Sequence, residues 1–560
     1  MQNRFEKGTF TGNEMISCRT LYKANGYSEE DFDRPVIGIC NSFADLVPGH
    51  RHLRALSEEV KHGIYRAGGT PVEFGCISVC DGVCTTHDGS RYSLPSREVT
   101  ADGIEIMARA HRMDGLVLIG SCDKTVPGML MAAARLDIPC IFLAGGCMLG
   151  GPAFGALQKT NSTTPQEAEG MLQAGAISVR AMEDLSEVSC PTVGSCQHMA
   201  TANSMCCIAE VLGMSLPGTA AIPAVYNART RAAFHTGETI VSMVLKGITA
   251  RDLITEESLR NAIMFLLAAG GSTNCVLHLS AIADEIGIPP HTVLEWIDSY
   301  ADTVPLLVKI SPSSAVYDAE DFYKAGGVPE VLRQLRSVLY GNCLTVTGRT
   351  LSEEIRSFRN LYGSNPQVIS TMQDPFSKLA GIAVMRGSLA PSSGVSKPAA
   401  IAPEVRVFEG KAVCYDGEEA ANQALAKRQV KAGDVVVIRY ADPKGAPGMP
   451  EMYKPMKLLH GQGLDKTTAV ITDGRFSGTN NGCFVGHISP EAAAGGPIAL
   501  VRDGDRIRID VENRRVDLLV SEEELAKRRE QWSYTAPVTK GILRRYARDV
   551  QSADEGGVLR

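Results

Sequence analysis

The sequence predicts an N-terminal α/β domain built on a largely parallel sheet, followed by a β-rich, barrel-like domain. Apolar strands alternate with helical segments in the first part of the chain, which is typical of a parallel sheet. After about residue 375, short strands separated by Gly and Asp turns predominate. At 560 residues the chain is also too long for one ordinary core. We expect one domain over residues 1–370 and the second over residues 371–560.

In the first domain, an irregular arm with a short helix is expected over residues 1–33, before the alternation begins. The predicted strands are Pro35–Cys40, Asp114–Gly120 and Ile138–Ala144, and the predicted helices are Leu53–Ala67, Val126–Leu136 and Met199–Val211. Parallel sheets bind ligands at the carboxyl ends of their strands. The loops after Ile39, Ile119 and Val193 are therefore the expected places for a functional site.

In the second domain, few helices are expected between the strands until Ser521. The predicted strands are Asp434–Tyr440, Thr468–Thr472, Ile498–Val501, Arg506–Asp510 and Val516–Val520. Ser521 and Glu524 have the spacing of a capping box, which predicts a helix to about Trp532. Residues 365–400 are rich in Ser, Pro and Gly and are expected to cross between the two domains.

Composition narrows the class of protein. The formal net charge of −7 is mild and argues against a nucleic-acid partner. The apolar run around Gly115–Gly120 is too short to span a membrane, and Met1–Phe5 lacks the apolar region of a signal peptide. We therefore expect a cytoplasmic protein. Its sixteen cysteines include no Cys-x-x-Cys, which argues against a zinc ribbon and leaves metal binding or burial as explanations.

Two stretches place cysteine in polar loops. Ser121–Lys124 follows a predicted strand and is either an ordinary helix-capping loop or a metal-binding corner, with Cys for a soft metal and Asp for a hard one. Cys196 lies in Gly194–His198, just before a predicted helix whose dipole would stabilise a thiolate, although simple burial would also explain it.

Three more stretches carry oxygen ligands or a nucleophile. The Pro- and Gly-rich loop Asp442–Glu451 is rigid and presents Glu451, unless that carboxylate is simply solvated. Ser477 lies in a Gly-flanked loop, where serine is either a base or a turn former. Asp81 begins an acidic turn. No Gly-x-Ser-x-Gly elbow supports a serine hydrolase.

Together these stretches resemble the dihydroxy-acid dehydratase/6-phosphogluconate dehydratase family over essentially the whole chain. The matching stretches are Asn41–His50, Tyr92–Glu98, Cys122–Ala133, Gly270–Asn274, Pro443–Glu451, Asp473–Gly478 and Gly486–Ala492. The resemblance is greatest to the members that dehydrate 2,3-dihydroxy acids to 2-keto acids in branched-chain amino-acid synthesis. The resemblance also implies that this chain forms a homodimer or a dimer of dimers.

The resemblance also implies a role for each site residue. It implies an iron–sulfur cluster on Cys122 and Cys196, Mg²⁺ on Asp81, Asp123, a carbamylated Lys124 and Glu451, and Ser477 as the base in its alkoxide form. Carbamylation would turn a cation into an anionic oxygen ligand, which a hard divalent ion prefers.

The chain departs from the family at one cluster position. Many members with a [2Fe–2S] cluster have a third cysteine where this chain has Gly49, and members with glycine there are associated with a [4Fe–4S] cluster. Both cluster types therefore stay open. Cys80 and Cys84 are two possible replacements for the third ligand, and ordinary packing is the alternative for both.

Two other functions are alternatives to this one. The first is a dehydratase of aldonates, of the arabinonate, xylonate or gluconate type, whose pocket would need several hydrogen-bonding groups. The pocket for a branched-chain dihydroxy acid would instead be apolar beyond C3. The second is a non-catalytic iron–sulfur sensor. A sensor would need only the cysteines, so the presence of the oxygen ligands and the serine argues against it.

Overall fold

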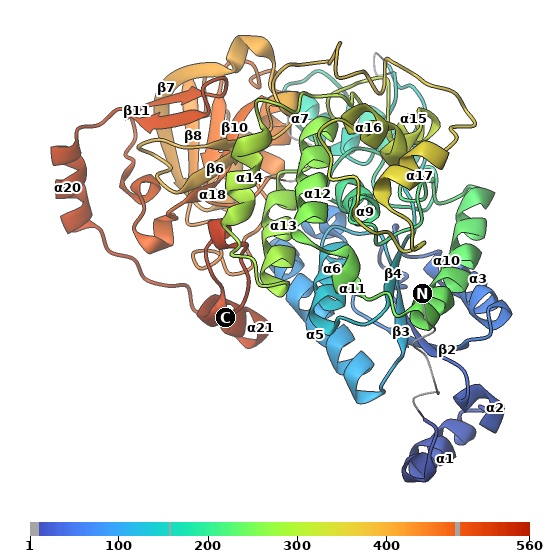
Figure 1. The fold of residues 1–560 in the computed structure, drawn as a ribbon. Coiled ribbons are helices and arrows are strands. Elements are labelled where there is room, and N and C mark those ends of the chain that lie inside the picture. The colour runs from blue at the N-terminus through green and yellow to red at the C-terminus, as the bar shows by residue number, and fades with distance from the viewer. Residues whose placement is uncertain (1–9, 156–157, 477–481) are drawn as a thin grey trace.

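Two separate sheets organise the chain, as Figure 1 shows. The computed structural model describes residues 10–155, 158–476 and 482–560. The first sheet has four strands and lies among most of the helices, whereas the second has eight and forms the body drawn in orange and red. Each sheet has its own hydrophobic core, and the larger core joins the first sheet to its helices.

The first sheet is entirely parallel, with strand order β2-β1-β3-β4. Its strands are β1 (Val36–Asn41), β2 (Thr70–Gly75), β3 (Gly115–Gly120) and β4 (Cys140–Ala144). β1, β3 and β4 are buried along their whole length, which explains why they appear in the sequence as continuous apolar runs rather than alternating ones. The predicted parallel α/β sheet is confirmed.

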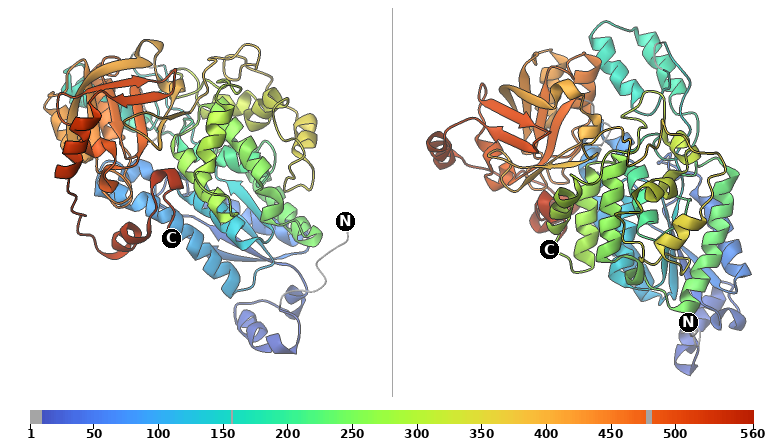
Figure 2. Two further views of the ribbon diagram at one scale, coloured as in Figure 1. Left: turned by 60° about the vertical axis from the view of Figure 1, so that its left-hand side comes forward. Right: turned by 45° about the horizontal axis from the view of Figure 1, so that its top comes forward.

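Helices pack around this sheet and extend beyond it. Those of the N-terminal half are α1 (Ile16–Ala24), α2 (Glu29–Phe32), α3 (Leu53–Arg66), α4 (Asp81–Cys84), α5 (Ser93–Ala110), α6 (Thr125–Leu136), α7 (Thr164–Gln173), α8 (Val179–Val188), α9 (Thr201–Val211) and α10 (Asn227–Lys246). They are followed by α11 (Ala250–Leu253), α12 (Glu256–Ala269), α13 (Asn274–Glu285), α14 (Thr292–Tyr300), α15 (Ala319–Lys324), α16 (Gly327–Leu335) and α17 (Leu351–Ser357). α7 and α8 leave this body and lie beside the second sheet, where α7 packs on α19 (Figure 2).

The second sheet is mixed and curls into a nearly closed barrel. Its strands are β5 (Ala383–Met385), β6 (Ser393–Ser396), β7 (Val407–Asp416), β8 (Asp434–Arg439), β9 (Ala469–Thr472), β10 (Cys483–Ser489), β11 (Arg506–Asp510) and β12 (Arg515–Leu518). The outer strands are β12 and β5, and a single bridge between Arg386 and Arg515 joins their ends. The predicted barrel-like sheet is thereby confirmed.

Helices α18 (Glu418–Ala426), α19 (Lys454–Gly461), α20 (Glu522–Gln531) and α21 (Gly541–Asp549) accompany the barrel. α18 and α19 lie between strands, where few helices were expected. At α20 the Ser521 hydroxyl accepts a hydrogen bond from the Glu524 amide, as predicted. The Glu524 carboxylate bonds to Arg528 instead of completing the capping box.

One predicted strand is wrong, and so is the strand end implied at Val193. Residues Ile498–Val501 were expected to form a strand, but Pro497–Leu500 is a turn of 3₁₀ helix. The prediction failed because a short buried apolar run does not distinguish a strand from a helical turn. No strand ends at Val193: that segment is irregular and makes only one bridge, between Ser195 and Cys147. Pro191 within it cannot donate to a strand ladder.

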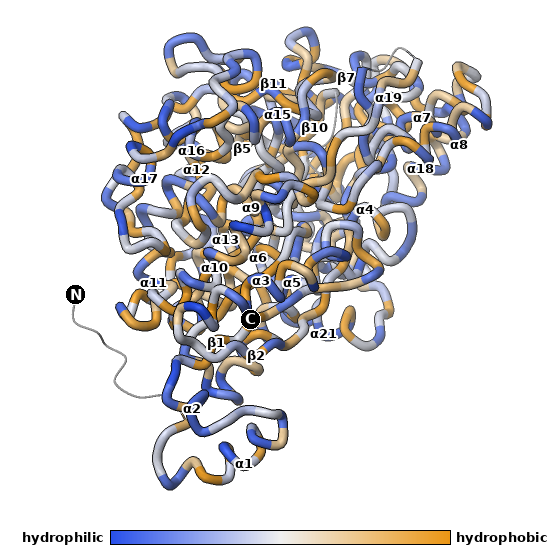
Figure 3. Tube along the Cα trace, turned by 90° about the vertical axis from the view of Figure 1, so that its right-hand side faces the viewer, coloured by the Kyte–Doolittle hydropathy of each residue, from blue (hydrophilic) through white to orange (hydrophobic). Residues whose placement is uncertain are grey.

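The N-terminal segment that carries α1 and α2 projects away from both sheets, below β1 and β2 (Figure 3). A small apolar cluster of Phe10, Phe32 and Val36 attaches it to the start of β1. Within the described ranges, no helix has the length and apolar character that crossing a bilayer requires.

Candidate active site

The loops that follow three strands of the parallel sheet carry most of the predicted site residues. Gly49 lies in the loop after β1, Asp81 follows β2, and Cys122 with its two neighbours follows β3. Because all three strands run in the same direction, their carboxyl ends meet at one edge of the sheet. This edge is where sequence reasoning expected the site.

The barrel supplies the other side of the site. Glu451 lies in the Pro- and Gly-rich loop between β8 and α19, and Arg475 follows β9. A backbone bridge between Glu451 and Arg475 holds the two loops together. Residues more than 300 positions apart in the sequence, such as Lys124 and Glu451, are thereby brought into contact.

Asp81, Asp123 and Glu451 form what we call the acid cluster. One carboxylate oxygen from each lies within 4.8 Å of the other two. The Lys124 ammonium is completely buried among them, with Nζ 2.5 Å from Asp81 Oδ2, 3.2 Å from Glu451 Oε1 and 3.9 Å from Asp123 Oδ2. All four predicted oxygen-ligand residues thus meet at one point.

A second cation supports the barrel side of the acid cluster. The fully buried Arg475 places Nη1 2.9 Å from Glu451 Oε1 and 3.2 Å from Asn274 Oδ1. Asn274 Nδ2 donates to the same Glu451 oxygen at 2.7 Å. Arg475 Nε also donates to the Met449 carbonyl at 2.7 Å. Glu451 is therefore fixed from both parts of the protein.

Burial and charge act differently on the two aspartates. Burial would raise the pKa of Asp81, but the charges of Lys124 and Arg475 outweigh it, so the pKa lies below its ordinary value. Burial, together with the charge of Asp81, raises the pKa of Asp123 to about 8. For Lys124, Asp81 and Glu451 overcome burial and raise the pKa. The positive charge near the acid cluster is therefore not enough to keep Asp123 ionised at neutral pH.

The acid cluster fits a divalent metal ion. Asp81 Oδ1 is buried and has no hydrogen-bond partner among the described residues, whereas Oδ2 already accepts from Ser93 Oγ at 2.7 Å and from Lys124. An orphaned buried carboxylate oxygen is costly unless something satisfies it. The three carboxylates offer oxygen atoms, which are the ligands that hard cations such as Mg²⁺ prefer.

The two predicted cluster cysteines lie beside the acid cluster. Cys122 is buried and directly precedes Asp123, while Cys196 is half-buried in the irregular segment before α9. Asn203 Nδ2 donates a hydrogen bond to the Cys196 carbonyl at 2.7 Å. Burial is the first cause that raises the pKa of Cys196, and the charge of Asp123 is the second. Thiol sulfur atoms fit an iron–sulfur cluster, whose iron is held by cysteine.

His50 positions the loop of Cys122. Its Nδ1 donates to the Ser42 carbonyl at 2.9 Å, and its Nε2 accepts the amides of Ser121 and Cys122 at 3.1 and 3.0 Å. Burial lowers the pKa of His50 to about 4, so the ring is neutral and can accept both amides. Sequence reasoning assigned no role to His50, Asn274 or Arg475, although all three lie in stretches that matched the family.

Ser477, the predicted base, lies outside the described residues. The chain that leads to it is fixed two positions earlier by Arg475. The next residue, Phe476, is completely buried, and its carbonyl accepts a hydrogen bond from Thr273 Oγ1 at 3.3 Å.

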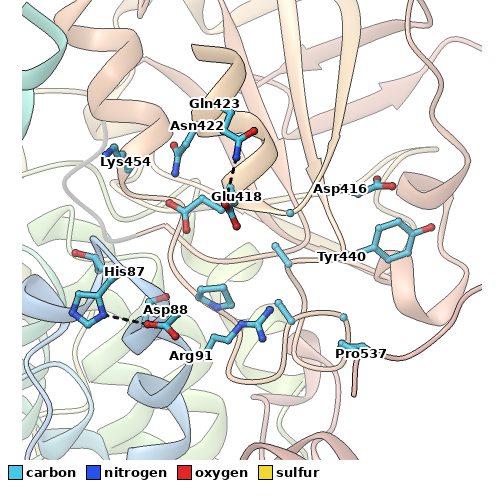
Figure 4. A pocket seen from close by; sticks show the side chains of 18 of the residues that line it. His87, Asp88, Arg91, Asp416, Glu418, Asn422, Gln423, Tyr440, Lys454 and Pro537 are labelled. Carbon is cyan, nitrogen blue, oxygen red and sulfur yellow. Dashed lines mark hydrogen bonds and ion pairs between the residues drawn. The ribbon is translucent and has the colours of Figure 1, made fainter. Parts of the chain in front are cut away.

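A cavity of about 1050 Å³ lies between the segment that follows α4 and the barrel (Figure 4). Its lining includes Thr85, which caps α4, and Pro450, the neighbour of Glu451. Most of the side chains labelled in Figure 4 are polar: His87, Asp88, Arg91, Asp416, Glu418, Asn422, Gln423, Tyr440 and Lys454. The described lining is thus largely polar, and it approaches the acid cluster through Pro450 without including any residue of that cluster.

Two family profiles match consecutive parts of the chain. The dihydroxy-acid/6-phosphogluconate dehydratase N-terminal profile matches residues 34–354, and the corresponding C-terminal profile matches residues 367–557. Together they include every residue of the acid cluster, Lys124, both cysteines and Arg475.

Curated relatives match over nearly the full length. Dihydroxy-acid dehydratase of Caldanaerobacter subterraneus subsp. tengcongensis is 48% identical over 552 residues, which cover 98% of each chain. Proteins with the same name from Pyrococcus furiosus and Acetivibrio thermocellus are each 47% identical over 551 residues, again with 98% of both chains covered.

Proposed function

The chain belongs to the dihydroxy-acid/6-phosphogluconate dehydratase family, and we propose on that basis that it is a dihydroxy-acid dehydratase of branched-chain amino-acid synthesis. The full-length identity of 48% to a protein of that name carries the proposal. The reaction removes water from a 2,3-dihydroxy acid. The C2–H and C3–O bonds break, and the resulting enol takes a proton at C3 to become a 2-keto acid.

Two inorganic groups would supply the Lewis acids of this reaction. Asp81, Asp123, Glu451 and a carbamylated Lys124 would hold Mg²⁺, and Cys122 and Cys196 would hold an iron–sulfur cluster. A bound cation polarises the oxygen atoms of a hydroxy acid and stabilises negative charge that develops at C2. Arg475 and Asn274 keep Glu451 in place, and His50 keeps the loop of Cys122 in place.

Carbamylation of Lys124 would depend on the metal ion. Asp81 and Glu451 raise the pKa of Lys124, so the amine stays protonated while no other cation is bound. A protonated amine cannot react with carbon dioxide. An Mg²⁺ ion among the same carboxylates would repel the ammonium and favour the neutral amine. We therefore propose that metal binding and carbamylation occur together.

Replacing Ser477 with alanine tests the proposed base. We expect the Ser477→Ala enzyme to lose about 10²–10⁴-fold in turnover, the usual contribution of a general base. Keto-acid release should be measured alongside iron, sulfide and magnesium content. Near-normal turnover with intact metal content would show that Ser477 is not the base.

The cavity in Figure 4 favours a second candidate, an aldonate dehydratase. A branched-chain dihydroxy acid needs an apolar pocket beyond C3, whereas the hydroxyl groups of a sugar acid need hydrogen-bonding partners. The polar side chains of the cavity, among them Arg91, Asn422 and Lys454, match the second requirement. The nearly full-length sequence identity to named dihydroxy-acid dehydratases favours a branched-chain dihydroxy acid as the substrate.

Direct assay decides between these substrates. Anaerobically purified enzyme should be given 2,3-dihydroxyisovalerate, arabinonate, xylonate and gluconate at equal concentrations, and keto-acid release compared as kcat/KM. We expect 2,3-dihydroxyisovalerate to be preferred by at least tenfold, about 1.4 kcal/mol of transition-state binding. A preference for any aldonate would overturn the assignment and leave the dehydratase chemistry intact. No release from any of the four would contradict both.

We also propose a cytoplasmic homodimer, or a dimer of dimers, with a domain boundary near residue 370. Sedimentation of the cluster-loaded enzyme would measure the assembly.

A further inference from the structure

A third thiol lies at the same place as Cys122 and Cys196. Cys80 is half-buried and caps the N-terminus of α4. Its sulfur interacts with the Cys122 thiol through a side-chain hydrogen bond. Charge on Cys80 also acts on Cys196, so the three sulfur atoms share one electrostatic environment.

The sequence pair Cys-Asp occurs twice at this edge of the sheet. Cys80 precedes Asp81 in the loop after β2, and Cys122 precedes Asp123 in the loop after β3. In both pairs the aspartate contributes to the acid cluster. In both pairs the cysteine contacts the other one, so Cys80 and Cys122 lie together. Each loop therefore presents one soft ligand and one hard ligand from adjacent residues.

Gly49 contributes no sulfur, and its surroundings show the space that a side chain would enter. A Cβ atom built on Gly49 would lie 3.1 Å from Cys122 Sγ and 3.4 Å from the Ser195 backbone. Gly49 thus faces the gap between the loops of Cys122 and Cys196. The loop after β1 therefore offers Cys122 no sulfur neighbour at Gly49. The loop after β2 does offer one, because Cys80 contacts Cys122.

Other nearby cysteines are less suited to the same role. The Cys84 thiol is directed to the Asp81 carbonyl, 3.5 Å away, and not toward Cys122. Cys190 is exposed. The Cys80 side chain instead contacts the Cys122 thiol. A third cysteine ligand has to reach the same cluster as the other two, so Cys80 suits the role best of these three.

We propose that Cys80 is the third cysteine ligand of the iron–sulfur cluster and takes the place of the thiolate that Gly49 cannot supply. This inference rests on the proposed cluster at Cys122 and Cys196. It adds that the loop after β2 holds both inorganic groups, the cluster through Cys80 and Mg²⁺ through Asp81.

The first test compares Cys80→Ala with Cys84→Ala and Cys190→Ala. Each protein is reconstituted anaerobically with iron and sulfide, and cluster content is measured after gel filtration, with EPR of the reduced state. We expect Cys80→Ala to retain at most about one tenth of the wild-type iron and sulfide, and the two controls to match the wild type. A Cys80→Ala protein with wild-type iron, sulfide and EPR spectrum would overturn the proposal.

A second test uses the unmodified chain and so does not depend on a variant that folds. Cluster-loaded and cluster-free protein are alkylated with iodoacetamide, and the modified cysteines are identified by peptide mass spectrometry. We expect Cys80 to be protected when the cluster is bound and alkylated when it is removed, whereas exposed Cys190 reacts in both forms. Equal alkylation of Cys80 in the two forms would contradict the proposal.

Neither readout needs turnover. A protein that binds the cluster through Cys80 but dehydrates no hydroxy acid would refute the proposed function alone. A protein whose Cys122→Ala and Cys196→Ala variants keep the cluster would refute the proposed cluster site and this inference with it.

Discussion

Replacing Lys124 with methionine is expected to abolish dehydration almost completely. Methionine has a similar length but can neither form a carbamate nor neutralise Asp81 and Glu451, which lie 2.5 and 3.2 Å from the lysine nitrogen. A metal Lewis acid supplies several kcal/mol of transition-state stabilisation. Losing its ligand should therefore lower kcat/KM by about 10³-fold or more. Keto-acid release and bound magnesium are the measurements.

The same substitution should also weaken the fold of the metal-free protein, in which Lys124 is an ammonium paired with Asp81 and Glu451. Removing one partner of a buried ion pair leaves an uncompensated charge and costs about 3–5 kcal/mol. Lys457→Met is a matched control, because Lys457 is also buried and ion-paired, with Glu167 Oε1 at 2.8 Å, but outside the acid cluster. We expect the control to lose stability in urea while each folded molecule keeps its activity.

A carbamate can be observed directly. Wild-type protein equilibrated with Mg²⁺ and ¹³C-bicarbonate should show a lysine carbamate signal by NMR that is missing from Lys124→Met. If Lys124→Met kept both its magnesium and its turnover, Lys124 would have no role as a ligand.

The sequence predicted three strands of the parallel sheet, but not the partly exposed β2, because those three have a simple physical signature. β1, β3 and β4 are buried on both faces, so each appears as an unbroken apolar run between polar loops. The strands of the barrel were harder to predict from the sequence. β7 is partly exposed and alternates irregularly in burial, and neither it nor β10 was predicted. α18 begins directly after the strand β7, so its helical pattern was hidden in a region expected to be β-rich.

The acid cluster could be anticipated only in part from local sequence. Asp123 and Lys124 follow a strand directly, which marks them as residues at the ligand-binding edge. Glu451 lies in a loop of the other sheet, and no local pattern places it beside Lys124. Its assignment came from the resemblance, and the contact depends on how the two sheets pack. Asn274 and Arg475 act through Glu451, so their roles became visible only with the structure.

Replacing Arg475 with methionine is expected to have the second largest effect. The Arg475 guanidinium bonds to Glu451, to Asn274 on α13 and to the Met449 carbonyl, and it is completely buried. Without it, the Glu451 carboxylate keeps Lys124 and Asn274 as partners but loses its side-chain link to the loop after β9, which only the backbone bridge then holds. That loop leads to Ser477. We expect a loss of about 10²-fold in kcat/KM, at the upper end of what residues supporting a metal ligand contribute, and weaker magnesium binding.

Arg439→Met separates this effect from a general loss of stability. Arg439 donates to the carbonyls of Ala499 and Val501 and to the Asp416 carboxylate, so it makes as many contacts in the barrel as Arg475 but none with the acid cluster. Both variants should unfold at lower urea concentration. Only Arg475→Met should need more Mg²⁺ for half-maximal activity, because only Arg475 positions a proposed ligand. An equal magnesium requirement in the two variants would mean that Arg475 stabilises the barrel and leaves the metal site unaffected.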